Sequence, residues 1–126
     1  MIGMNFEYVK IRITESEWLI DRTSIESEYD EESDIGIIGG SLMFKDGSIF
    51  HFKEVFLGDV RRYRFHYMNS GNNLILRWDN APHHKNLKTF PHHVHLPDAV
   101  EEHEEIDFIE ALNRIEEIVI RTLDAF

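Results

Sequence analysis

A stripe of apolar residues at helical spacing near the C-terminus constrains the fold more than any other feature of the sequence. The stripe comprises Ile109, Leu112, Ile115, Val119 and Leu123, flanked by Phe108 and Ile118. Intervals of three and four residues place these side chains on one face of an α-helix, and the opposite face is charged. Asp107 followed by Glu110 resembles a capping box and predicts where the helix begins. A helix with one apolar face needs a sheet or a partner to cover it, so the sequence predicts a two-layer α+β fold.

The residues before this helix read as antiparallel strands separated by turns. Turn signals occur at 45–47 (Lys-Asp-Gly), 58–59 (Gly-Asp) and 69–72 (Asn-Ser-Gly-Asn). Alternation of polar and apolar residues predicts a first strand over 6–14, whereas 18–29 is either a short helix or an irregular strand. We therefore expect an antiparallel meander of about five strands with the C-terminal helix packed on one face.

Two details of these strands carry further expectations. Gly39-Gly40 interrupts an apolar run and predicts a bulge or a close approach of backbones. In the segment 62–67, Arg62, Arg64 and His66 alternate with tyrosine and phenylalanine, so they share one face of a strand. Pairing with the next strand would add Arg77 to that face. The aromatic residues Trp18, Phe44, Phe52, Phe56 and Phe65 read as core.

Length and composition bound the class of protein. At 126 residues the chain is expected to form a single domain, 1–126. It has no cysteine, which excludes disulfides, thiolate metal sites and cysteine nucleophiles. The N-terminus resembles neither a signal peptide nor a transit peptide, and no segment is apolar enough to cross a membrane. We therefore expect a cytoplasmic protein that does not associate with membranes.

Positive charge is concentrated in one part of an acidic chain. The net charge is −11, which by itself argues against binding to nucleic acid. Residues 61–95 depart from this average, because they hold a single acid, Asp79, and six basic residues: Arg61, Arg62, Arg64, Arg77, Lys85 and Lys88. Six of the eight histidines lie in the same stretch. This asymmetry indicates a local anion site, unless the basic part simply folds against the acidic part.

The segment 78–96, WDNAPHHKNLKTFPHHVHL, contains five histidines and two Pro-His-His triplets. Histidine is a mediocre former of helices and strands, but its pKa lies near neutrality and its ring nitrogens bind metals. One interpretation is a divalent metal site, because His93 and His95 point the same way in an extended chain. Asp79 with His83 or His84 would complete it. Zinc or nickel would suit such ligands.

A second interpretation is metal-independent acid–base chemistry on RNA. That reaction needs a base for the 2′-hydroxyl proton, an acid for the leaving oxygen and cations for the phosphate. Trp78, Phe90 and Tyr67 are candidates for stacking on bases. A third interpretation is a scaffold of rigid turns. It explains any single histidine but not five, because hydrogen bonding in a loop does not require imidazole.

The residues 62–95 also carry a family resemblance. The fragments RYRFHY, RWDNAPHH and TFPHHVH are similar to the signature of the TumE-type toxin family of prokaryotic toxin–antitoxin systems. The resemblance implies the toxin half of such a pair, encoded beside a small cognate antitoxin that is often a helix-turn-helix protein.

The resulting hypothesis is a toxin that acts on RNA through a histidine-rich basic face, as a metal-independent ribonuclease without a cofactor. The proton-transfer candidates are His66, His83, His93 and His95, with Asp79 as the orienting carboxylate. Arg64, Arg77 and Lys85 are expected to hold phosphate. The alternative is a non-catalytic module that binds a protein, a nucleic acid or a divalent metal, with Asp79, His84, His93 and His95 as ligands. Whether the chain is an enzyme and whether it forms a homodimer stay open.

Overall fold

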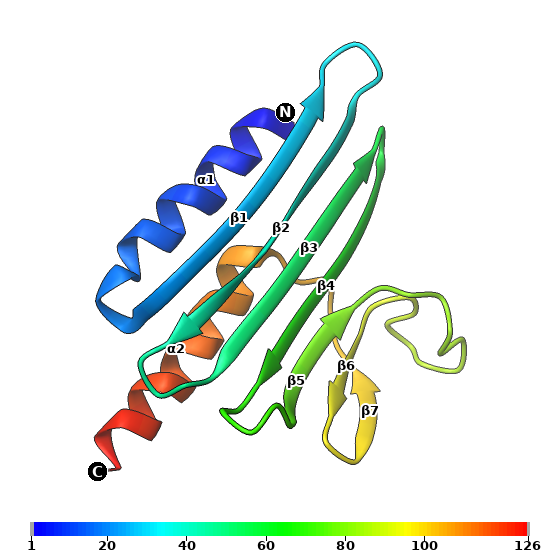
Figure 1. Ribbon diagram of the computed structural model, residues 1–126. Helices are drawn as coiled ribbons and strands as arrows, with labels where there is room; N and C mark the ends of the chain where they lie inside the picture. The colour runs from blue at the N-terminus through cyan, green and yellow to red at the C-terminus, as the bar shows by residue number, and fades with distance from the viewer. Residues whose placement is uncertain (1, 126) are drawn as a thin grey trace.

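The computed structural model describes residues 2–125 and consists of one antiparallel sheet with two helices on the same face (Figure 1). The elements in chain order are α1 (Ile2–Glu15), the 3₁₀ turn η1 (Glu17–Leu19), β1 (Ile20–Asp30), β2 (Ile35–Phe44), β3 (Ile49–Leu57), β4 (Val60–Met68), β5 (Leu74–Asp79), β6 (His93–Leu96), β7 (Ala99–Glu102) and α2 (Phe108–Asp124). The strands follow one another in the sheet in sequence order, β1 to β7. The predicted α+β meander with a C-terminal helix is confirmed, although the sheet has seven strands rather than about five.

The helix α1 corrects the sequence prediction of a strand over 6–14. Phe6, Val9 and Ile13 are buried, and their spacing of three and four residues defines one helical face. A strand would bury Ile11 and expose Arg12. In the structure Ile11 is 55% exposed and Arg12 is buried. A segment of nine residues is too short to distinguish the helical period of 3.6 residues from the strand period of two when one buried position is an arginine.

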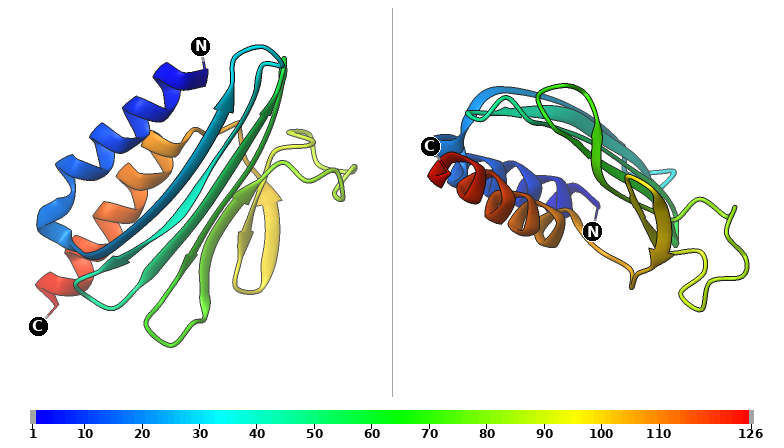
Figure 2. Two further views of the ribbon diagram at one scale, coloured as in Figure 1. Left: turned by 45° about the horizontal axis from the view of Figure 1, so that its top comes forward. Right: turned by 90° about the horizontal axis from the view of Figure 1, so that it is seen from below.

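Arg12 is buried because it joins the two helices. Its Nη2 lies 2.8 Å from Glu116 Oε2 and donates to Asn113 Oδ1 at 2.9 Å, both on α2. Its Nη1 donates to Ser16, which also contacts Glu116. A buried guanidinium requires such partners for its donors. These contacts hold α1 and α2 side by side against the sheet, as both views in Figure 2 show.

The helix α2 begins as predicted, because the Asp107 carboxylate accepts a hydrogen bond from Glu110 N at 2.8 Å. Its buried face differs slightly from the predicted stripe: Phe108, Ala111, Leu112, Ile115 and Val119 are buried, and Ile109 is 39% exposed. Phe108 is packed between sheet residues, with ring centroids 4.8 Å from Phe52 and 5.7 Å from Phe50. The core therefore lies between the two helices and the sheet.

The turns and the Gly39-Gly40 pair behave as the sequence predicts. Each predicted turn joins two adjacent strands, and Gly47 adopts φ +85° within the hairpin between β2 and β3. Gly40 is opposite Ile25 on β1, and a Cβ on Gly40 would lie 1.9 Å from the Ser24 carbonyl oxygen. The two backbones approach too closely for any side chain at this position.

Side chains alternate between a buried face and an open face across the central strands. Phe52, Phe65, Trp78 and Val94 form a row of cross-strand neighbours that is buried on the inner face of the sheet. Trp18, predicted as core, is instead 63% exposed, because it lies in η1 at the edge of the helical layer. Within residues 2–125, no helix has the length and apolar character needed to cross a membrane.

Candidate functional site

Two rows of polar side chains cross the open face of the sheet. One row consists of Lys53, Arg64, Asp79 and His93, which are successive cross-strand partners on β3, β4, β5 and β6. The second row consists of His51, His66, Arg77 and His95 on the same four strands. Because side chains alternate with a period of two, these rows flank the buried aromatic row and point away from it. The predicted grouping of Arg64, His66 and Arg77 on one face is confirmed.

A cleft of about 370 Å³ lies over these rows, between the open face of the sheet and the segment 80–92. Four cationic side chains line it: Lys53, Arg62, Arg64 and Arg77. Asp79, Asn80, His83, His84, His93 and His95 line the rest together with Val55, Tyr63 and Ala81. The cleft therefore combines a cationic wall with a cluster of imidazoles around one carboxylate.

Asp79 is the centre of this cluster. Its side chain is 8% exposed, and its Oδ1 lies 2.8 Å from Nε2 of His93 while its Oδ2 lies 3.1 Å from Nε2 of His95. The two Nε2 atoms are 3.1 Å apart. The Ala81 backbone N–H also donates to Asp79 Oδ1, at 3.0 Å. Both carboxylate oxygens are thus used, and the carboxylate fixes two imidazoles at once.

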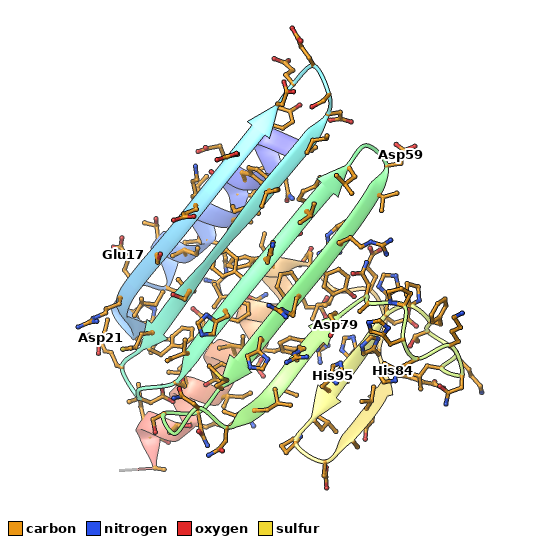
Figure 3. All side chains as sticks on the ribbon, turned by 45° about the vertical axis from the view of Figure 1, so that its right-hand side comes forward. Glu17, Asp21, Asp59, Asp79, His84 and His95 are labelled. Atoms are coloured by element: carbon orange, nitrogen blue, oxygen red, sulfur yellow. The ribbon has the colours of Figure 1, made fainter. Side chains whose placement is uncertain are left out.

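His84 approaches the same point from the segment 80–92. Its ring centroid lies 4.8 Å from that of His93 and 5.7 Å from that of His95. One ring nitrogen from each of His84, His93 and His95 falls within 4.8 Å of the others. Figure 3 shows the labelled Asp79, His84 and His95 together at the end of β5, far from the labelled acidic residues Glu17 and Asp21 at the β1 edge.

Buried hydrogen bonds fix the segment 80–92 to the sheet. Asn80 Oδ1 accepts from the backbone N–H of Tyr63 at 3.0 Å, and Asn80 Nδ2 donates to the Arg61 carbonyl at 2.8 Å. At the other end, the ring of His92 stacks on Tyr63, with centroids 5.8 Å apart. Burial raises the pKa of Tyr63 to about 12, so its hydroxyl keeps its proton, and it forms a hydrogen bond with His92 Nδ1 at 2.9 Å.

His66 positions an arginine of the cationic wall. Arg77 Nε donates to His66 Nδ1 at 3.0 Å, so this ring nitrogen carries no proton. Partial burial, with Arg77 as the next cause, lowers the pKa of His66 below its usual value. His66 is therefore neutral at pH 7. Partial burial also lowers the pKa of His95, while Asp79 acts in the opposite direction.

The structure brings most of the predicted site residues together. Asp79, His83, His93, His95, Arg64 and Arg77 all line the cleft, as does the alternative ligand His84. His66 and Lys85 are not among the lining residues. Of the three aromatic residues predicted to stack on bases, Trp78 and Tyr67 are buried in the core, and only Phe90 is exposed, at 40%. Their position on the inward face of the sheet explains the error.

Sequence reasoning missed several residues of the cleft. Lys53 lies on β3, outside the histidine-rich stretch, and enters the site as the cross-strand partner of Arg64. Arg62 was placed on the correct face but not in the site. Asn80 and Tyr63 shape the cleft through hydrogen bonds across more than fifteen residues of sequence. Only Arg62 left a sequence signal, through its alternation with Arg64 and His66.

Comparison with known proteins identifies a family for this chain. A family model described as "Toxin TumE" matches residues 10–123, which include the whole sheet and nearly all of α2. No curated protein and no solved structure matches the chain.

Proposed function

Because the chain belongs to the TumE toxin family, we propose that it is a toxin that acts on RNA in the cleft between the open sheet face and the segment 80–92. The reaction we propose is cleavage of the phosphodiester backbone. One observation is the main support: the junction of Asp79, His93 and His95 lies in the same cross-strand rows as Arg64 and Arg77. Groups that move a proton and groups that hold a phosphate are thus adjacent.

The cationic wall suits an RNA phosphate. Lys53, Arg62, Arg64 and Arg77 line the same cleft, and a guanidinium binds two phosphate oxygens at once. Cations that contact the phosphate also stabilise the negative charge that grows on its oxygens in the transition state. RNA is favoured over DNA as the substrate because its 2′-hydroxyl supplies an internal nucleophile. The protein then needs to take the proton of this hydroxyl and to give a proton to the leaving oxygen.

The cluster around Asp79 supplies the proton-transfer groups. Asp79 holds His93 and His95 by contacts of 2.8 and 3.1 Å, and a carboxylate in this position orients an imidazole and stabilises its protonated form. His95 is the half-exposed member of the pair and faces the cleft. His83, exposed on the segment 80–92, is the candidate for the opposite side of the phosphate. A mechanism that needs no metal stays a prediction.

The partner implied by membership of a toxin family is an antitoxin, and we propose that it is a small protein encoded next to the toxin gene. Such a protein would inhibit the toxin most directly by covering the cleft. Its contact surface should be acidic, because it must compete with RNA for the cationic wall.

Asp79→Asn tests the proposal with the smallest change of shape. The wild-type chain should arrest growth when expressed without its antitoxin, and the purified chain should cleave single-stranded RNA. Asp79→Asn should reduce the rate of cleavage by about 100-fold or more, since it removes the orienting charge. Asp98→Asn, in an exposed turn between β6 and β7, is the matched control and should retain full activity.

Two results would refute the proposal. Growth arrest by Asp79→Asn equal to that of the wild type would exclude the cluster from the toxic activity. Binding of RNA without cleavage by the wild type would instead favour the non-catalytic binding module.

A further inference from the structure

Three imidazoles and one carboxylate lie together at the base of the cleft. One ring nitrogen each of His84, His93 and His95 lies within 4.8 Å of the others, and the Asp79 carboxylate contacts His93 and His95. The inner group consists of both Asp79 oxygens and the two Nε2 nitrogens. Oδ1 lies 2.8 Å from Nε2 of His93, Oδ2 lies 3.1 Å from Nε2 of His95, and the two Nε2 atoms are 3.1 Å apart. Carboxylates and neutral imidazoles are common metal ligands, because each can donate an electron pair to a metal ion.

The hydrogen bond of His93 to the backbone shows which of its nitrogens carries the proton. Nδ1 of His93 lies 2.8 Å from the carbonyl oxygen of Pro91, and a carbonyl only accepts hydrogen bonds. Nδ1 must therefore carry a proton, and if the ring is neutral this is its one proton. Nε2 then carries a lone pair, which points at Asp79 Oδ1 at 2.8 Å.

The protons of a neutral cluster do not satisfy this contact. A proton on His95 Nε2 can be donated to Asp79 Oδ2 or to His93 Nε2, both at 3.1 Å. The 2.8 Å contact between His93 and Asp79 still joins two lone pairs, which repel each other. The His93 side chain is 1% exposed and the Asp79 side chain is 8% exposed, so bulk water does not screen the contact. A cation bound between these atoms removes the repulsion.

We propose that Asp79, His84, His93 and His95 bind a divalent transition-metal ion of the zinc class. Zinc with Zn–N distances of about 2.0–2.1 Å and tetrahedral geometry holds its ligand atoms about 3.3 Å apart. The three contacts of the inner group are shorter than that spacing by about 0.2 to 0.5 Å. His84, on the segment 80–92, moves inward to complete the set. Nitrogen donors favour zinc over magnesium or calcium, which prefer oxygen.

The outer contacts of the cluster match those of metal sites. A histidine that binds a metal through one nitrogen commonly donates its other N–H to a backbone carbonyl, as His93 does to Pro91. The Asp79 carboxylate is likewise held by the Ala81 N–H at 3.0 Å. Asp79 and His93 are direct cross-strand partners, and His95 follows two residues later on the same face. The ligands are thus positioned by strands rather than by loops alone.

This inference stands on the donor geometry and does not depend on RNA being the substrate. If both proposals hold, the ion lies beside Arg64 and Arg77, within the cleft that would receive the phosphate. Zinc lowers the pKa of a water bound to it. Such a water would then act as the base, the role that we predicted from the sequence for a free imidazole.

Zinc titration of the purified chain tests the inference directly. The chain should be produced with a tag that contains no histidine, treated with a chelator and titrated with Zn²⁺ by calorimetry. We expect one zinc ion per chain and an increase in thermal stability on binding. Replacement of zinc by Co²⁺ should give the visible absorption of a four-coordinate cobalt site.

Variants assign the ligands. His93→Ala and His95→Ala should each lower zinc affinity by about 100-fold or more. His93 is buried and its replacement can unfold the chain, so circular dichroism must first show that His93→Ala is folded. If it is not folded, the zinc affinity of His95→Ala decides the assignment, because the His95 side chain is partly exposed. His51→Ala on β3 and His83→Ala beside His84 are matched controls that remove an imidazole outside the ligand set. Both should bind zinc as the wild type does.

The inference is overturned if the wild type binds no zinc, which would leave a doubly protonated His93 as the partner of Asp79. It is also overturned if His83→Ala weakens binding as much as His95→Ala, since that indicates diffuse binding by a histidine-rich segment. Zinc binding without RNA cleavage would refute only the proposed function. RNA cleavage by a zinc-free chain in the presence of chelator would refute only a part for the ion in the cleavage, since the titration alone decides whether the site exists.

Discussion

Asp79 shows how one residue acquires its role from its neighbours in the sheet. It is the single acid within residues 61–95, and pairing places Arg64 on one side of it and His93 on the other. A carboxylate that is 8% exposed requires partners for both oxygens. The Ala81 N–H supplies one for Oδ1, His95 lies against Oδ2, and the inferred metal ion would join Asp79 to His93. The same geometry that satisfies the buried charge also aligns the groups proposed to act on RNA.

His66 is expected to act through Arg77 rather than on the substrate. His66→Ala removes the acceptor that holds Arg77 Nε at 3.0 Å, and the freed guanidinium loses its fixed direction. Cleavage of RNA by this variant should show a KM raised about tenfold with kcat little changed, the size expected for a weakened charge-assisted hydrogen bond. Steady-state kinetics would check this. A collapse of kcat at unchanged KM would mean that His66 itself transfers a proton.

Glu54 gives the stability a pH dependence of defined sign. It is buried beside Arg61, with Glu54 Oε2 2.9 Å from Arg61 Nε. Burial raises the pKa of Glu54 above its usual value of 4.5, and Arg61 offsets this only in part. The folded state therefore binds the Glu54 proton more readily than the unfolded state does. The stabilising effect of protonation is present at low pH and is lost as the pH rises through the raised pKa.

The Glu54→Gln variant isolates this contribution. The free energy of unfolding of the wild type, relative to that of Glu54→Gln, should fall as the pH is raised from about 4.5 to 7. Urea unfolding at several pH values measures the difference, and the exposed Glu26→Gln is the control. A difference that grows with pH would show that the pairing with Arg61 outweighs burial.

At the scale of single elements, α2 depends on its first turn. The Asp107 carboxylate accepts from Glu110 N at 2.8 Å and satisfies one of the free N–H groups at the start of the helix. Asp107→Ala should lower the free energy of unfolding by about 1 kcal/mol. Chemical denaturation measures this. Asp124→Ala at the other end of α2 should cost nothing or stabilise slightly, because it removes a negative charge from the negative end of the helix dipole.

The pairing of β1 with β2 depends on Gly40. A methyl group there would lie 1.9 Å from the Ser24 carbonyl oxygen, so Gly40→Ala must displace the backbone of β1. We expect a loss of about 1–3 kcal/mol in the free energy of unfolding, as for other overpacked sites. Gly3→Ala meets only a Tyr29 side chain at 3.8 Å and should not destabilise. Equal stability of the two variants would contradict the close approach.

At the scale of the whole molecule, the charge is divided between two regions. The net charge is −11, yet the cleft has a cationic wall, and the labelled acids Glu17 and Asp21 lie at the opposite edge of the sheet (Figure 3). An acidic body repels RNA over most of its surface and leaves the cleft as the attractive region. The charge separation thus favours one orientation of approach.

Salt should therefore weaken RNA binding strongly in spite of the net negative charge. Four cations in the cleft predict a slope of about −3 in a plot of log affinity against log salt for single-stranded RNA. Arg64→Glu should weaken binding and flatten the slope by about one unit or more. Arg114→Glu, on the exposed side of α2, should change neither. Fluorescence anisotropy at several salt concentrations tests this, and affinity independent of salt would exclude phosphate as the ligand of the wall.

The local sequence determined the elements whose signals are short-ranged. The cap at Asp107, the turn at Gly47 and the alternation around Arg64 all predicted the observed structure, because each depends on residues within one turn or one strand pair. The prediction of a strand over 6–14 was wrong, because the burial of Arg12 depends on Glu116 and Asn113, which lie more than ninety residues away in the sequence. The alternation of Trp78 with Arg77 placed Trp78 on the opposite face, but only the tertiary structure decided that this face is buried.

The sequence alone determined that imidazoles, guanidinium groups and one carboxylate occur in a single stretch, and that strands would alternate between two faces. Only the tertiary structure decided that Asp79, His93 and His95 share one junction and that Lys53 joins them from a different hairpin. The physical reason is strand register. A shift by one residue turns every side chain of a strand to the other face, and the register is set by packing of the buried rows against α2.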